Sequence, residues 1–123
     1  MLFTMATTAV AFGEEPSIFG RWQLSIKNQG TDYLFSLNIL ERSTIFSLKC
    51  TSDGQTGEVS AELATKIDGY KYQVMGSVNK GVDVGEVDCR LRIPADDMTF
   101  DTDGRQLKLV SSRGDPVFFN RVE

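Results

Sequence analysis

The hydrophobic pattern of most of the chain is that of short β-strands. In residues 58–67, for example, Val59, Ala61, Leu63 and Ile67 share one face, while glutamate, serine and lysine side chains lie on the other. A period of two residues places alternate side chains on opposite faces of a strand. Because no segment shows the longer period of an amphipathic helix, the chain is predicted to be all-β, with strands that bury one face.

Turn residues separate these runs about every 10 to 13 residues, which is the spacing of an antiparallel barrel or sandwich. Turns are expected at Lys80–Gly81 and, as a two-residue hairpin turn, at Asp103–Gly104, among other places. The connections are too short for parallel crossovers. The pattern therefore predicts an up-and-down antiparallel β-barrel of eight or nine strands, formed by residues 14–123 as one domain. The predicted segments are 21–28, 33–40, 44–51, 58–67, 70–79, 84–93, 98–101, 106–111 and 117–122.

Large aromatic side chains on the predicted inward faces are the candidate ligand-binding residues. An eight-stranded barrel is just wide enough to be filled by side chains or to hold one small ligand. A buried tyrosine needs a hydrogen-bond partner, so inward tyrosines indicate either a filled core with internal hydrogen bonds or a pocket with a polar end. The sequence leaves both alternatives open. The candidates are Tyr33, Phe35, Phe46, Tyr70 and Tyr72.

Composition and charge exclude several function classes. The 123 residues carry 13 Lys and Arg against 17 Asp and Glu, with both signs interleaved, so a nucleic-acid partner is not expected. The chain has no histidine, which removes Ser-His-Asp and Cys-His catalysis and histidine-ligated zinc. The carboxylates near Asp101 and Asp103 do not fit a calcium loop. We therefore expect no enzyme activity, no metal site and no cofactor.

The N-terminal segment resembles the end of a secretory signal peptide. Residues 1–13 carry no charge, and Ala9-Val10-Ala11 matches the small-x-small pattern of a cleavage site. These residues are expected to be a signal-peptide remnant and a flexible N-terminus. They are too few to span a bilayer, and no later apolar run approaches about 18 residues, so no transmembrane segment is expected. We expect a secreted or periplasmic protein.

The two cysteines, Cys50 and Cys89, both fall on predicted inward faces. In an oxidising compartment such a pair is expected to form a disulfide. Two buried, unpaired cysteines are the alternative interpretation.

Two short motifs, one near each end of the predicted domain, indicate a family. Gly20-Arg21-Trp22 opens the first strand as a G-x-W, and Phe119-Asn120-Arg121 ends the last strand as an aromatic-x-Arg. This pairing resembles the signature of the calycin and lipocalin families. The resemblance implies that the guanidinium of Arg121 packs over the indole of Trp22 at a closed barrel end, a favourable cation–π contact.

The chain is shorter than a typical lipocalin and is similar in size to small lipocalin-like proteins of bacterial envelopes. These include secreted metalloprotease inhibitors, whose close cysteine spacing Cys50 and Cys89 do not match.

The expected function is that of an exported, non-catalytic binding protein for a small, mostly apolar ligand. The alternative is a protein-binding barrel, such as a secreted or periplasmic protease inhibitor that acts through residues 12–19 and the loops around one barrel mouth. An unfilled interior would favour the ligand, whereas a packed interior beside an exposed apolar patch would favour a protein partner.

Overall fold

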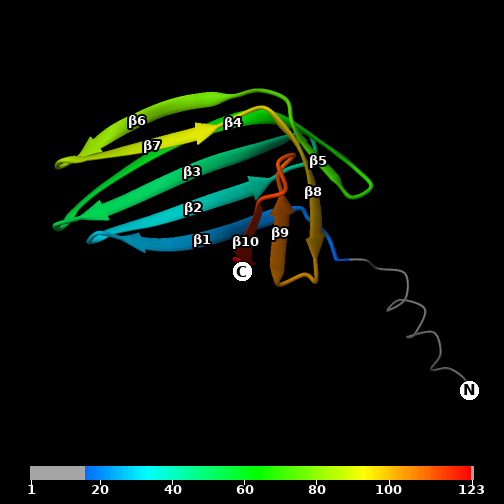
Figure 1. The fold of residues 1–123 in the computed structure, drawn as a ribbon, viewed down its shortest axis with the longest axis horizontal. Coiled ribbons are helices and arrows are strands. Elements are labelled where there is room, and N and C mark those ends of the chain that lie inside the picture. The colour runs from blue at the N-terminus through cyan, green and yellow to red at the C-terminus, as the bar shows by residue number, and fades with distance from the viewer. Residues whose placement is uncertain (1–15, 123) are drawn as a thin grey trace, which may run out of the picture.

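A computed structural model of the protein describes residues 16–122, and these residues form antiparallel β-structure (Figure 1). Eight strands close into a barrel in the order β1-β10-β9-β8-β5-β4-β3-β2, while β6 and β7 form a separate two-stranded sheet. The predicted antiparallel barrel is confirmed. The strands are β1 (Gly20–Asn28), β2 (Thr31–Ile39), β3 (Ser43–Ser52), β4 (Gln55–Asp68), β5 (Lys71–Val74), β6 (Val78–Val84), β7 (Val87–Ile93), β8 (Asp96–Thr102), β9 (Gln106–Val110) and β10 (Pro116–Arg121).

The β6–β7 hairpin interrupts the up-and-down order, because β5 pairs with β8 rather than with β6. The sequence predicted one strand over 70–79 and a turn at Lys80–Gly81, and both predictions are wrong. Strand β5 ends at Val74, and β6 continues through Gly81 to a turn at Gly85–Glu86. Gly81 is paired with Arg90, whose side chain lies so close that a Cβ at position 81 would be 3.1 Å from Nη2. The glycine therefore accommodates a neighbouring side chain and does not form a turn.

The turn expected at Asp103–Gly104 is present, but it has three residues, 103–105, between β8 and β9. The carboxylate of Asp103 accepts backbone hydrogen bonds from Gln106 and Arg105, each at 2.8 Å. These bonds hold the pKa of Asp103 below its ordinary value. The aspartate thus closes the turn through its side chain.

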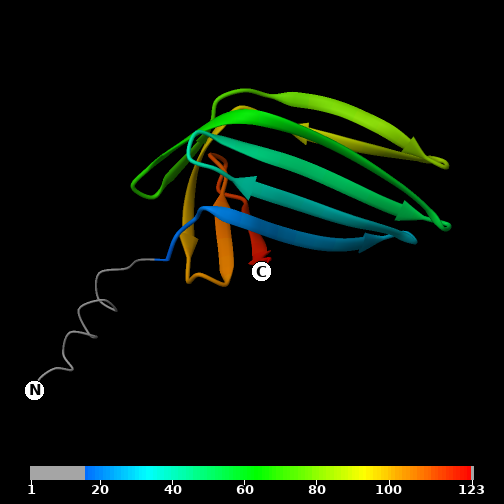
Figure 2. The ribbon, with the colours of Figure 1, turned by 180° about the vertical axis from the view of Figure 1, so that it is seen from behind.

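The barrel is closed at one end and splayed at the other. Strand β1 pairs with β2 along nine residues, but it pairs with β10 only at Trp22 with Arg121 and Gln23 with Asn120. Beyond Gln23, β1 runs away from β10 (Figures 1 and 2). The far halves of the long strands therefore form an open, curved sheet.

The β6–β7 hairpin covers part of this curved sheet. A Cys50–Cys89 disulfide joins β3 to β7, which confirms the predicted bond. On β4, a Cβ at Gly57 would lie 2.6 Å from Cγ2 of Val84, so only glycine allows the hairpin to pack this closely. Val84, Cys89 and Leu91 are buried as a result. The hairpin thus belongs to the hydrophobic core.

Large side chains fill the closed half of the barrel. Trp22, Tyr72, Leu37, Ile39 and Leu107 are each at most 1% exposed. Within residues 16–122, every buried side-chain nitrogen or oxygen atom has a hydrogen-bond partner. In this closed half of the barrel, Tyr72 is part of a filled core.

Arg121 and Trp22 hold the closed end together. The guanidinium carbon of Arg121 lies 4.0 Å from the centroid of the Trp22 ring. The same guanidinium donates to the carbonyl oxygens of Phe19 and Ser17, at 2.7 Å each, and to that of Gly104 at 3.0 Å. One planar cation therefore joins β10 to the segment before β1 and to the β8–β9 turn.

Gly20 and Trp22 complete this arrangement. A Cβ at Gly20, whose φ is 118°, would lie 2.7 Å from Nη1 of Arg121. The indole N–H of Trp22 donates to the carbonyl of Ile18 at 2.9 Å. The contact that the G-x-W and aromatic-x-Arg motifs implied is thus present.

The predicted signal-peptide remnant at residues 1–13 lies outside the described residues. Between residues 16 and 122 there is no helix of the length and apolarity needed to cross a membrane.

Replacement of Arg121 by alanine should lower the free energy of unfolding by about 2–3 kcal/mol, because it removes a cation–π contact and three hydrogen bonds from a charged donor. Chemical denaturation followed by circular dichroism would measure this loss. The control is Arg113→Ala, since Arg113 is exposed and its only ion pair in the described part of the chain is a 3.9 Å contact with Asp115. A double-mutant cycle with Trp22→Phe should show coupling, and strict additivity would contradict the contact.

The double variant Cys50→Ala/Cys89→Ala should lose about 4 kcal/mol, since the disulfide closes a loop of 39 residues and restricts the unfolded chain. Guanidinium unfolding of the oxidised protein and the variant measures the difference. A loss below about 1 kcal/mol would show that the bond contributes little beyond the hairpin packing.

Candidate binding groove

An apolar groove lies between the curved sheet and the β6–β7 hairpin. Its volume is about 270 Å³. Strands β1, β2 and β3 line one side of it and β7 lines the other, so we call it the β1–β7 groove. Its lining residues are Leu24, Ile26, Tyr33, Phe35, Leu48, Arg90, Leu91, Arg92 and Ile93.

The groove is open because two elements stop short of covering the sheet. Strand β10 leaves β1 after Gln23, and the hairpin packs on β3 and β4. The inward side chains of β1 beyond Trp22 therefore lack a covering layer. Ile26 is 50% exposed, and Leu24 is only partly buried. An apolar surface of this kind is a candidate interaction site.

Two arginines give the groove a positive rim, and no carboxylate from residues 16–122 lines it. The Nε of Arg90 lies 2.8 Å from the Asp88 carboxylate, and Nη1 donates to the side-chain oxygen of Asn79 at 2.8 Å. Arg92 is exposed and makes no ion pair or side-chain hydrogen bond within the described range. Arg92 is therefore a cation available to a bound molecule.

Two of the five predicted ligand-binding residues line this groove. They are Tyr33 and Phe35, and the Phe35 ring also packs against Phe119 with the centroids 5.7 Å apart. Phe46 and Tyr72, at 3% and 0% exposure, lie in the packed core and do not line the groove.

The prediction that Tyr70 points inward is wrong. Tyr70 is 68% exposed and lies in the turn between β4 and β5, with its ring centroid 6.3 Å from that of Phe100. The alternation of inward and outward side chains holds only within a strand, and β5 begins at Lys71. Tyr70 and Tyr72 are therefore not consecutive inward positions.

Tyr72 has a structural role in the described core. Its hydroxyl lies 2.7 Å from Oγ1 of Thr44, which in turn lies 3.1 Å from Oγ1 of Thr65. Burial raises the pKa of Tyr72 to about 12, and the hydrogen bond with Thr44 only partly opposes this shift. The three hydroxyls satisfy one another inside the barrel.

Sequence reasoning missed most of the groove. Leu24 and Ile26 alternate with Trp22, so the period of two could have placed them on the inward face. Leu91 and Ile93 alternate with Cys89, which the sequence places on an inward face. What the sequence did not reveal is that β7 would lie above the sheet and face Leu24 and Ile26 across a gap.

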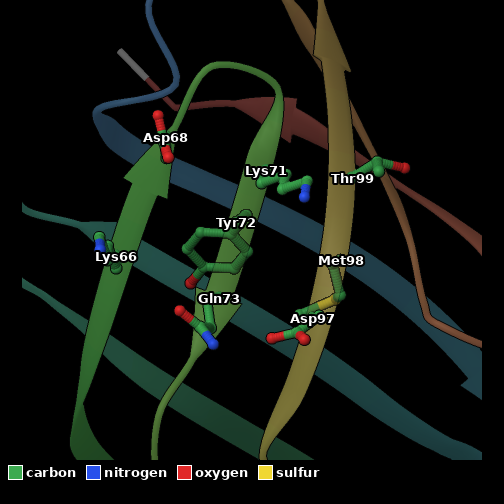
Figure 3. A pocket seen from close by; sticks show the side chains of 8 residues that line it. All are labelled: Lys66, Asp68, Lys71, Tyr72, Gln73, Asp97, Met98 and Thr99. Carbon is green, nitrogen blue, oxygen red and sulfur yellow. The ribbon is translucent and has the colours of Figure 1, made fainter.

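A second depression, of about 350 Å³, lies over β4, β5 and β8 (Figure 3). Figure 3 shows that charged side chains of both signs, including Lys66, Lys71 and Asp97, extend from these three strands. The described residues contain no group of three or more His, Cys, Asp or Glu side chains that could hold a metal ion. This depression has the mixed polarity of an ordinary protein surface, so the β1–β7 groove is the better candidate.

Comparison with known protein families, curated proteins and solved structures finds no match to this chain.

The stability of the protein should fall between about pH 10 and pH 12. The pKa of Tyr72 is raised in the folded state, so the neutral phenol adds up to about 2–3 kcal/mol to the free energy of unfolding. This contribution is complete below pH 10 and is lost as the pH rises through about 12. Denaturation midpoints measured across this range test the prediction. In Tyr72→Phe this part of the decline should be absent, and an identical decline in both proteins would contradict the assignment.

Proposed function

We propose that the protein is an exported, non-catalytic, lipocalin-like barrel that binds a protein partner at the β1–β7 groove. The observation that carries the proposal is a filled barrel interior beside an open apolar groove. Trp22 and Tyr72 occupy the space that a carrier would keep for a ligand. A partner that covers exposed apolar surface is then favoured over an enclosed small molecule.

The dimensions of the groove support the same choice. At about 270 Å³ it is smaller than the roughly 300–1,000 Å³ of typical small-molecule sites, and it is open along the β1 side. Ile26 on β1 is 50% exposed in it, and Val117 on β10, which alternates with the buried Phe119, is 38% exposed. Another protein can cover such a spread-out surface, whereas a small ligand cannot.

Support for the lipocalin-like assignment comes from the closed end. Gly20, Trp22 and Arg121 contact one another there, as the family resemblance implies, and Phe119 packs in the core beside them.

The Cys50–Cys89 disulfide is compatible with an oxidising, extracellular or periplasmic location.

The N-terminal arm is a weaker candidate for partner contact than the groove. Of residues 12–19, residues 12–15 lie outside the described residues. The carbonyl groups of Ser17, Ile18 and Phe19 accept hydrogen bonds from Arg121 or Trp22. The described part of the arm is thus committed to closing the barrel, and the proposal places the partner at the groove.

Photo-crosslinking tests the proposal. With p-benzoylphenylalanine in place of Ile26, irradiation in the producing cells should give a discrete covalent adduct with another polypeptide, identified by mass spectrometry. The same substitution at Leu40, which is 40% exposed next to β2 and outside the groove, is the matched control and should give no such adduct. If position 26 yields no adduct while the folded protein binds an apolar dye with one-to-one stoichiometry, the small-ligand function replaces the proposed one.

A further inference from the structure

The edge of β1 is unpaired over residues 24–28. The carbonyl of Arg21 accepts a hydrogen bond from the backbone N–H of Val122, so the odd-numbered residues of β1 direct their backbone polar groups away from β2. Ser25 and Lys27 continue this series, but no strand within residues 16–122 pairs with them on that side. Such a row of unpaired N–H and C=O groups can accept another strand.

This sheet edge carries little of the usual protection. Proteins protect edges with lysine, proline, bulges or inward-pointing charges, and of these residues 24–28 have only Lys27. The inward side chains of this edge are Leu24 and Ile26, both apolar, and the pairing of β1 with β2 is continuous to Asn28. Lys27 points outward, with its Nζ 3.7 Å from the carboxylate of Asp32 on β2, and so leaves the edge accessible.

Within residues 16–122, no strand is paired to this edge on the β10 side. Strand β10 separates from β1 beyond the Gln23–Asn120 pair, and Pro116–Phe119 pairs only with β9 (Figure 2). The two edges diverge from that point. A strand entering this wedge would continue the barrel wall that β10 begins.

The added strand would use the groove for its side chains. Alternate residues of a strand paired with β1 lie on the concave face, beside Leu24 and Ile26. There they would contact Phe35 from β2 and face Ile93 of β7 on the opposite side of the groove. Backbone pairing at the edge and apolar burial in the groove would therefore act on the same segment.

The charges around the groove indicate which side chain the added strand should carry. Arg92 lines the groove without a partner in the described part of the chain, and the nearby Asp88 carboxylate is paired with Arg90. Residues 24–28 contain no acidic residue, so the β1 strand of a second copy would not supply a carboxylate to Arg92. A different protein with an acidic residue fits better.

We propose that β1 binds its partner by strand addition. The partner contributes an extended segment in which apolar residues at every second position enter the β1–β7 groove and an acidic residue on the same face pairs with Arg92. This inference rests on the proposed function, because it specifies how a protein partner is held at the same groove.

A designed peptide tests the inference directly. The probe is a capped peptide in which valine, valine and glutamate occupy alternate positions and threonines separate them. We expect saturable binding, measured by calorimetry, together with slower hydrogen exchange at the amides of Ser25 and Lys27. N-methylation of the peptide amides that face the edge should weaken binding about tenfold, because it removes backbone hydrogen bonds.

Two protein variants separate the edge from the charge. Ser25→Pro removes one edge donor and should weaken binding about tenfold, and circular dichroism would verify that this variant folds. Arg92→Gln should weaken binding about threefold and abolish the preference for glutamate over glutamine in the peptide. Arg113→Gln, on the exposed β9–β10 connection, is the matched control and should leave binding unchanged.

The outcomes distinguish this inference from the function on which it rests. Equal affinity for the N-methylated peptide, or absence of peptide binding while position 26 still crosslinks to a protein, overturns strand addition and leaves the groove function standing. If the peptide does not bind and position 26 gives no crosslink, strand addition and the groove function are both overturned. If the protein self-associates and Ser25→Pro abolishes this self-association, the strand bound at β1 comes from a second copy. That outcome would overturn the proposal of a different partner with an acidic residue.

Discussion

The stacking of Arg121 on Trp22 is the interaction on which the rest of the structure depends. The β1–β10 seam has only two residue pairs, which is little backbone pairing for closing a barrel. The Arg121 guanidinium compensates by binding three carbonyl groups and the indole face at once. A planar group with several donors in fixed directions suits this role better than a lysine ammonium would. The barrel is therefore held shut at one end by side-chain contacts, while the backbone of β1 beyond the seam remains free.

The β6–β7 hairpin covers the concave face of β3 and β4. The disulfide from Cys50 to Cys89 and the contact of Val84 with Gly57 hold the hairpin on this face. Because the hairpin is only two strands wide, it covers β3 and β4 but not β1. The groove is the part of the apolar face that remains.

A filled barrel and an open edge together change the kind of recognition that the fold favours. Small barrels that bind ligands keep an internal space, but here Trp22, Tyr72 and the Thr44 hydroxyl network occupy it. The proposed site is on the rim, where backbone groups of Ser25 and Lys27 lie next to apolar side chains. Such a site combines the general affinity of main-chain hydrogen bonds with the specificity of side-chain contacts.

The sequence by itself determined the class of fold and indicated two contacts between distant parts of the chain. The period of two in residues 58–67 identified inward and outward faces, because side-chain direction along a strand is a local property. The short turns implied antiparallel neighbours. Cys50 and Cys89 on inward faces indicated the disulfide, and the motifs around Trp22 and Arg121 indicated the closed end.

The tertiary structure alone decided the strand order and the site. Residues 70–79 alternate almost as one strand, yet β5 ends at Val74 and pairs with β8, so that the chain between them forms the hairpin. For the same reason Tyr70 is exposed and Tyr72 is buried, although they are only two residues apart. The position at which β1 stops pairing with β10 depends on the direction in which β10 leaves the seam. Such pairings join residues far apart in the chain, and local alternation carries no information about them.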